Sequence, residues 1–268
     1  MINRNYAVQA LLVLLIPFAG MSLIHCGVNL FPIAEDARLG ASLDAEIRNN
    51  PREYPVHNDA NLREYVQGIS NQLVQSPAVR YRGTFPYKVE IINDPRTLNA
   101  FCTPGGYIYV YTGLIKALDN EASLAAVMGH EIAHAERRHS TQRMTKAMGA
   151  QMMLQIALGQ NPSKTTEIAA NLFTGLALLK NSRDDESESD EYSFKYMQST
   201  RWYPGALSYF FEKVNSNRGG AIERMLSTHP LPQDRIDACN ERVRKANLPP
   251  PTEENLQTRT YQQIKSRL

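Results

Sequence analysis

Apolar residues recur three and four positions apart in several stretches of the chain, the spacing that gives a helix one buried face. In residues 61–74, Leu62, Val66, Ile69 and Leu73 follow this spacing, and residues 57–59 offer a cap just before it. The pattern predicts an adaptor and then a helix within residues 29–47, helices over residues 61–74, 120–135, 144–158, 165–179, 185–198, 204–214 and 231–246, and a polar helix or tail over 253–268.

Strand signals are fewer than helix signals. Residues 87–92 alternate as a strand does, and residues 107–111 form a β-rich run directly after the turn at Gly105-Gly106. We therefore expect an α+β fold, dominated by helices, with a small sheet. The pattern suggests a linker and helix over residues 26–57, a main domain over 58–246 and a polar C-terminal helix or tail over 247–268.

The N-terminal residues have the pattern of a targeting segment. Residues 7–23 form an apolar run after the single charged side chain Arg4, as in a secretory signal. Leu23 lies three residues before Cys26, a spacing that resembles the bacterial lipoprotein signal. We expect a signal peptide over residues 1–25 and lipidation at Cys26, with an uncleaved membrane anchor or simple secretion as the alternatives.

Composition narrows the functional class. The 29 Lys and Arg residues nearly balance the 27 Asp and Glu residues, which argues against a dedicated nucleic-acid binder. Three cysteines are too few for a disulfide framework. Apart from Cys26, Cys102 and Cys239 remain, either as a pair or as two buried thiols.

The stretch His130-Glu131-Ile132-Ala133-His134 carries the most specific chemistry. Two histidines four residues apart lie on one helix face and can bind one Zn²⁺ together. Glu131 leaves the helix about 100° away from His130, so it can act on a water molecule as general base without being a ligand. The alternative is a solvated His/Glu face of a helix.

A catalytic zinc needs a third protein ligand. Ser140 stands ten residues after the first histidine, where some zinc peptidases have a third one, and His139 would point away from the His130/His134 face. We therefore expect a carboxylate farther along, and the acidic run over residues 184–191 supplies candidates. A solvated charged face or a calcium site would give the same composition, and composition alone does not choose among its acids.

Four segments together resemble the HtpX-like and CAAX-prenyl-endopeptidase-like zinc peptidases, metallopeptidase family 48, in particular their periplasmic lipoprotein branch. They are residues 98–114, the HEIAH motif with Arg138-His139, residues 182–190, and residues 227–232 with Arg235. The resemblance implies a gluzincin-type domain in which the edge strand of a small sheet flanks the zinc cleft.

The resemblance also implies roles in the acidic run. Glu186 and Asp190 match the family's E-x-x-x-D pattern, so Glu186 would be the third zinc ligand. Asp190, one turn later, would accept a hydrogen bond from a ligand imidazole and fix its tautomer. Ser189 stands where the family usually has alanine, which keeps a small residue there.

His229 and Arg235 follow the acidic run by about forty residues. Taken alone, a histidine before proline is more often a cap or a surface residue, and Arg235 an ordinary exposed arginine. The resemblance instead places His229 near the metal, where it would stabilise the oxyanion or occupy the open zinc position and keep the enzyme latent. Arg235 would pair with a carboxylate or orient a neighbour.

Gly106, Tyr107 and Ile108 are candidate substrate-binding residues. In this hypothesis the strand over residues 106–111 is an edge strand beside the zinc and pairs with an extended substrate backbone. The alternative is a strand within the core. Asn99 would contact the substrate or brace this strand.

These observations lead to one main expectation. The resemblance implies a zinc metalloendopeptidase with one Zn²⁺ per chain, which hydrolyses unfolded or misassembled cell-envelope proteins from a lipid anchor on the periplasmic side of the outer membrane. One alternative is a chaperone-like or assembly adaptor with the same fold and little or latent proteolysis. Calcium binding by the acidic run is a weaker one.

Overall fold

The computed structural model describes residues 29–148, 181–216, 223–231 and 233–268. The expected signal peptide over residues 1–25, the lipidation site Cys26 and most of the two helices expected over 144–158 and 165–179 lie outside the described residues. Among the described residues, no helix combines the length and the apolar character that a membrane span requires.

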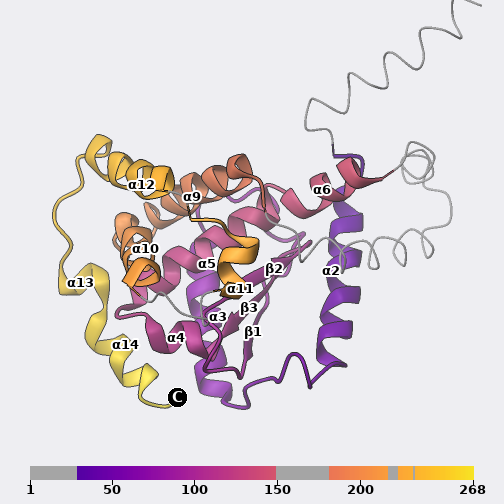
Figure 1. The fold of residues 1–268 in the computed structure, drawn as a ribbon, viewed down its shortest axis with the longest axis horizontal. Helices are drawn as coiled ribbons and strands as arrows, with labels where there is room; N and C mark the ends of the chain where they lie inside the picture. Colours follow the sequence, from indigo (N-terminus) through magenta and orange to yellow (C-terminus); the bar gives the residue numbers. More distant parts are fainter. Residues whose placement is uncertain (1–28, 149–180, 217–222, 232) are drawn as a thin grey trace, which may run out of the picture.

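Helices make up most of the described chain, as the apolar spacing predicts (Figure 1). Asp59 caps α3 by accepting hydrogen bonds from the backbone N–H groups of Asn61 and Leu62, as the position before the apolar run suggested. The short helices α4 and α11 were not predicted, and α6 shares only residues 144–147 with the helix expected over 144–158. The helices are α2 (Ile33–Arg48), α3 (Ala60–Leu73), α4 (Thr112–Ala117), α5 (Glu121–Glu136), α6 (His139–Ala147), α9 (Arg183–Met197), α10 (Leu207–Ser216), α11 (Glu223–Thr228), α12 (Gln233–Lys245), α13 (Glu253–Leu256) and α14 (Thr258–Lys265).

The sheet has three strands in the order β1-β3-β2, where β1 is Val89–Ile92, β2 is Ala100–Thr103 and β3 is Tyr107–Tyr111. β1 runs parallel to β3, and β2 runs antiparallel to it. The expectation that residues 106–111 form an edge strand is therefore wrong. Gly105 and Gly106, both at positive φ, turn the chain so that β2 and β3 form a hairpin, and β1 covers the other side of β3.

Helices cover both faces of the sheet. Ile91, Ile108 and Val110 point into the main core with α3 and α5, whereas Tyr109 packs with Ile47 of α2 on the other face. Helix α5 is buried along its whole length, and its start is capped by Asn120, whose side chain accepts from the backbone N–H of Ser123. This helix therefore lies at the centre of the molecule.

The C-terminal residues pack on the domain as two short helices, α13 and α14, in place of the single helix or tail that the sequence suggested. Tyr261 of α14 is fully buried and its hydroxyl donates to the carbonyl of Ile115 at 2.7 Å. Cys102 and Cys239 are both free thiols, so the pairing alternative is not realised.

Candidate metal centre

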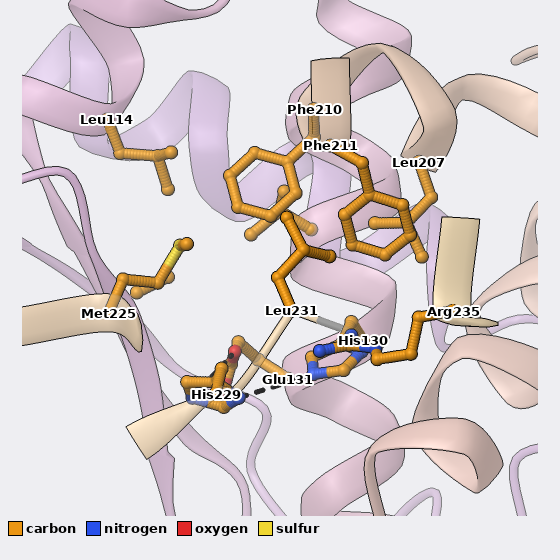
Figure 2. Close-up of a pocket in the computed structure, with 12 residues that line it drawn as sticks. Leu114, His130, Glu131, Leu207, Phe210, Phe211, Met225, His229, Leu231 and Arg235 are labelled. Carbon is orange, nitrogen blue, oxygen red and sulfur yellow. Dashed lines mark hydrogen bonds and ion pairs between the residues drawn. The ribbon is translucent and has the colours of Figure 1, made fainter. Parts of the chain in front are cut away.

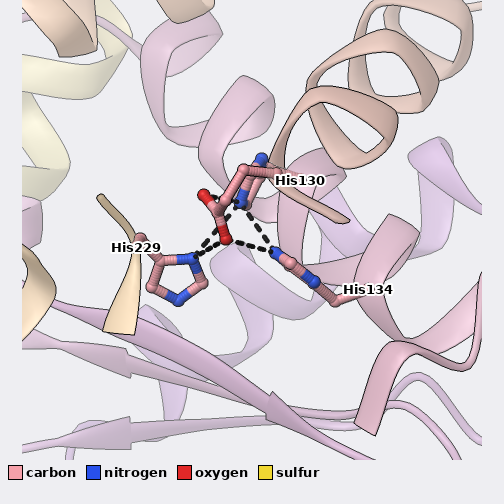
Figure 3. A group of neighbouring side chains, drawn as sticks. His130, His134 and His229 are labelled. Atoms are coloured by element: carbon pink, nitrogen blue, oxygen red, sulfur yellow. Dashed lines mark hydrogen bonds and ion pairs between the residues drawn. The ribbon is translucent and has the colours of Figure 1, made fainter. Parts of the chain in front are cut away.

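Helix α5 presents His130 and His134 on one face, one turn apart. Their Nε2 atoms lie 3.0 Å from each other, and both side chains are almost fully buried. Glu131 is buried beside them. The two imidazoles thus point the same nitrogen at one position, which is the arrangement that a shared metal ion requires (Figure 3).

Helix α9 brings Glu186 to the same position. Ser182 and Asp185 form a capping box that begins this helix, so Glu186 lies in its first turn. Its Oε1 atom is 3.3 Å from His134 Nε2, and its Oε2 atom is 3.5 Å from His130 Nε2. The carboxylate implied by the resemblance therefore lies next to the histidine pair.

His229 is the fourth member of the group. Its Nδ1 atom is 2.9 Å from Glu186 Oε1 and 3.4 Å from His130 Nε2, and its Nε2 atom is 3.8 Å from Glu131. The surface or capping role that the residue type alone favoured is thus not what the structure shows. His229 lies against the histidine pair, as the resemblance implied.

The geometry of this group fits a zinc ion. One ligand atom each from His130, His134, Glu186 and His229 can be chosen so that all lie within 4.8 Å of one another. Zn–N and Zn–O bonds of about 2.0–2.1 Å in a tetrahedron place neighbouring ligand atoms about 3.3 Å apart. The two Nε2 atoms lie 3.0 Å apart, and the nearest oxygen of Glu186 is 3.3 Å (Oε1) from His134 Nε2 and 3.5 Å (Oε2) from His130 Nε2, values around this one.

Asp190 and Arg235 contact members of the metal group on the side away from the metal position. Asp190 Oδ1 is 2.9 Å from His130 Nδ1, so it can fix the proton on that nitrogen and leave Nε2 free for a metal. Arg235 is buried and not an exposed arginine; its Nε and Nη2 atoms donate to Asp190 at 2.8 and 2.7 Å. Its Nη1 atom lies 2.6 Å from Glu186 Oε2 and donates to the carbonyl of Pro230, next to His229.

Burial and neighbouring charges shift the pKa values of Glu131 and Glu186 in opposite directions. Burial raises the pKa of the Glu131 carboxyl above its ordinary value. Burial acts in the same direction on Glu186, but the nearby His229 and His130 outweigh it and hold the pKa of Glu186 well below its usual range. Glu131 is therefore suited to exchange a proton, and Glu186 to remain an anionic ligand.

The model of the family described as Peptidase family M48 matches residues 60–243, most of the chain and all four members of the group. The chain belongs to peptidase family M48.

Relatives of this M48 chain occur in bacteria and in mitochondria. The beta-barrel assembly-enhancing protease of Escherichia coli K12 is 27% identical over 221 residues, 78% of this chain and 44% of that protein. A Vibrio cholerae protein is 30% identical over 215 residues, 75% of this chain and 43% of its own length. The mitochondrial metalloendopeptidase OMA1 of Schizosaccharomyces pombe is 30% identical over 201 residues, 74% of this chain and 57% of that protein. The chain thus spans less than half the length of the two bacterial relatives.

An apolar pocket opens beside the metal group of the M48 domain. Figure 2 shows the rings of Phe210 and Phe211 on one side of it and His130, Glu131 and His229 on the other. Apolar side chains form most of its wall. The remaining lining residues are Ala100, Leu114, Val127, Leu207, Met225, Leu231 and Arg235.

The expected substrate-binding residues occupy the interior of the sheet and its turn. Ile108 is fully buried in the central strand β3, and its backbone N–H donates to the carbonyl of Lys88. The backbone N–H of Gly106 donates to the carbonyl of Thr103 within the hairpin. These backbone groups are therefore not open to a substrate strand. Asn99 is buried, and its Oδ1 atom has no hydrogen-bond partner among the described residues.

The edge strand next to α5 is β2, which the sequence analysis did not assign as a strand. β2 pairs with β3 on one side. β2 packs against α5, and its residue Cys102 lies near enough to Glu131 for each group to act on the pKa of the other, so this strand reaches the acid next to the metal position. An edge strand does flank the cleft, as the resemblance implied, but it is Ala100–Thr103.

The acidic run is divided among several partners. Glu186 and Asp190 face the histidine pair, whereas Asp185 caps α9 and Glu188 accepts a hydrogen bond from Arg137 at 2.9 Å. Among the described residues, the group that contains Glu186 is the one cluster of three or more His, Cys, Asp or Glu side chains that lie close enough to share a metal. This division does not support the alternative of a calcium site in the run.

Two residues that contact the group were not predicted from the sequence, Asn181 and His139. Asn181 donates to Glu186 Oε1 at 2.7 Å, and its position just before the α9 cap carries no motif that would mark it. His139 lies with its Nδ1 atom 2.9 Å from His134 Nδ1. It is not a member of the metal group, but it does not point away from the paired histidines.

Proposed function

We propose that this chain is a zinc-dependent metalloendopeptidase with one Zn²⁺ per chain. The observation that carries the proposal is the convergence of His130, His134 and Glu186 on one position, with Glu131 beside them and not among the ligands. This set matches the three protein ligands and the separate acid of a catalytic zinc site. Membership of peptidase family M48 supports the same chemistry.

Each side chain has a role in this proposal. Zinc, when bound, supplies a Lewis acid that polarises the scissile carbonyl and makes a water molecule more acidic. Glu131 accepts the proton of the attacking water and transfers it to the leaving amine, and its raised pKa suits both transfers. Asp190 and Arg235 keep His130 and Glu186 in place. The apolar pocket receives an apolar side chain of the substrate.

His229 gives this site a latent conformation in our proposal. Its Nδ1 atom completes a four-donor group with the three ligands, so it occupies the position that a substrate carbonyl needs. Removal of this imidazole should therefore open the fourth position. We expect His229→Ala to raise the rate of proteolysis several-fold. A loss of about 100-fold would instead assign His229 to oxyanion stabilisation.

We propose unfolded or misassembled envelope proteins as the substrates. Such proteins expose apolar side chains, which match the apolar lining of the pocket, and the E. coli relative is named for beta-barrel assembly. The proposal includes a lipid anchor at Cys26 on the periplasmic side of the outer membrane. Substitution of Cys26 by serine in cells should release the protein from the membrane fraction, and unchanged fractionation would contradict the anchor.

The decisive test of catalysis is Glu131→Gln. This variant should bind zinc in a one-to-one ratio, as the wild type does, and lose cleavage of unfolded casein by at least 100-fold. His57→Ala is the matched control, because this histidine lies near the start of α3 and outside the site. Casein cleavage by Glu131→Gln at the wild-type rate would contradict the mechanism.

The four-donor conformation also favours a second candidate, an assembly adaptor with little proteolysis. In that case the purified zinc-loaded protein stays inactive, and His229→Ala does not activate it. Cleavage of casein by either protein would decide for the peptidase.

A further inference from the structure

The outer nitrogens of the paired histidines have different partners. His130 Nδ1 faces a carboxylate directly, since Asp190 Oδ1 lies 2.9 Å away. His134 Nδ1 instead faces another imidazole, with His139 Nδ1 at 2.9 Å. On its far side, His139 Nε2 lies 2.8 Å from Glu188 Oε2. His134 is therefore connected to a carboxylate through one intervening ring.

The hydrogen bonds that connect His134 to Glu188 can be assigned in order, starting at the metal position. His134 Nε2 points at His130 Nε2 and Glu186, so that nitrogen must be free of a proton to bind a metal. The proton of neutral His134 then lies on Nδ1 and is donated to His139 Nδ1. His139 can accept there only when its own proton lies on Nε2, which is the atom that faces Glu188.

We propose that His139, held by Glu188, is a positioning residue that fixes the ring orientation and tautomer of His134 as a metal ligand. The proposal rests on the metal site of the proposed function, and it adds a residue outside the HEIAH motif and outside the four-donor group. In this arrangement Glu188 selects the tautomer of His139, and His139 selects the tautomer of His134.

The surroundings show that this arrangement is built into the fold. The His139 side chain is only 1% exposed, and the Glu188 side chain that holds it is 36% exposed, so the buried contact is the one between the two imidazoles. Glu188 Oε1 accepts from Arg137 Nε and lies 2.9 Å from its Nη2, which leaves Oε2 for His139. Helix α5 ends at Glu136, and Arg138, in the left-handed region at φ 60°, is the residue just before α6, which begins at His139. This turn brings the ring of His139 back against His134.

Ser189 adds a feature of this particular chain. Its buried hydroxyl lies 3.4 Å from His139 Nδ1, on the same nitrogen that accepts from His134. Because the His134 contact is shorter by half an ångström, the imidazole and not the hydroxyl is the main donor to this atom.

Three variants test the proposal in the full chain. His139→Ala removes the acceptor for His134, whereas His139→Asn places an amide oxygen near the position of Nδ1 and keeps it. His57→Ala removes a histidine remote from the site. Zinc affinity is measured by competition with a chromophoric chelator, kcat and KM on casein-derived peptides, and the melting temperature on the metal-free proteins.

We expect His139→Ala to weaken zinc binding about 10-fold or more, the usual effect of losing a partner that orients a ligand. His139→Asn should recover most of that loss, and His57→Ala should bind zinc as the wild type does. With zinc saturating, His139→Ala should lower kcat and leave KM near the wild-type value, because the ring does not contact substrate.

Wild-type zinc affinity in His139→Ala would overturn the proposal, and so would equal weakening in His139→Ala and His139→Asn. A wild-type chain that binds zinc tightly but cleaves no peptide contradicts the proposed function and leaves the affinity comparison intact. A wild-type chain that binds no zinc contradicts both.

Discussion

At the scale of single residues, Arg235 links the separate parts of the site. Its guanidinium contacts Asp190 and Glu186 on α9 and the carbonyl of Pro230 in the segment that carries His229. The two carboxylate contacts lie in the interior, where an arginine is stable only when its hydrogen bonds and charge are satisfied, and the contact to Pro230 is partly buried. Arg235 thus balances two buried carboxylates, Glu186 in the metal group and Asp190, which contacts the outer nitrogen of His130.

Arg235→Ala should lower the free energy of unfolding of the metal-free protein by about 3 kcal/mol, because two carboxylates stay buried without their cation. Chemical denaturation in the presence of a chelator measures this. Arg244→Ala serves as the control, since Arg244 pairs with Glu241 on the exposed surface and its loss should leave the midpoint unchanged. Equal midpoints for Arg235→Ala and the wild type would show that this guanidinium does not stabilise the fold.

At the scale of secondary structure, α2 is fixed to the rest of the domain at two places. Asp36 accepts hydrogen bonds from Arg138 at the turn between α5 and α6. Gly40 lies against the hairpin turn, where an added Cβ would stand 2.1 Å from the carbonyl oxygen of Pro104. The helix therefore contacts the Arg138 side chain after α5 and the backbone of the hairpin turn.

Gly40→Ala should destabilise the protein by about 1–3 kcal/mol, because the new methyl group meets backbone that cannot rotate away. Gly68→Ala is the matched control. Gly68 also lies within a helix, but an added Cβ there meets nothing within 4 Å, so alanine should stabilise the protein by about 0.5–1 kcal/mol. Thermal unfolding of both variants measures the contrast, and a Gly40→Ala protein as stable as Gly68→Ala would contradict the close approach.

Helix positions were predictable from the chain because their signals are local. The apolar spacing and caps of α3 and α5 depend on neighbours within a turn or two, and so does the HEIAH pair. Strand order depends on pairing between distant segments, so nothing in residues 106–111 revealed that β1 and β2 would cover both edges of β3. The interpretation of β3 as an edge strand failed for that reason.

The site was predictable to the extent that short spacing determines it. His130, Glu131 and His134 follow from one helix, whereas the choice of Glu186 among six acids came from resemblance and not from physical reasoning. His139 was interpreted as if α5 continued as a straight helix. A left-handed arginine at position 138 redirects the chain, and neither residue type nor spacing marks such a conformation at an arginine.

At the scale of the whole molecule, the central helix α5 receives side chains from segments that are far apart in the chain. Glu186 follows His130 by 56 residues, and His229 contacts His130 across 99 residues. α9 packs against α5 so closely that a Cβ on Gly129 would stand 2.9 Å from the hydroxyl of Ser193. A metal ion bound by these residues would join α5 to α9 and would therefore stabilise the fold as well as the site.

Zinc should consequently raise the melting temperature of the metal-free protein, and a chelator should reverse the change. An ion that binds only the folded chain contributes about 2.7 kcal/mol when its free concentration is 100 times its Kd. Differential scanning fluorimetry with and without zinc measures the shift.

Glu186→Ala should lose most of the zinc-induced shift, because one proposed ligand that joins α9 to α5 is gone. Glu131→Gln should keep the shift, because Glu131 is not a ligand in the proposed site. Identical melting temperatures in zinc and in chelator would mean that these four side chains do not bind the ion, whatever their arrangement. A shift retained in Glu186→Ala would instead mean that zinc binds elsewhere on the protein.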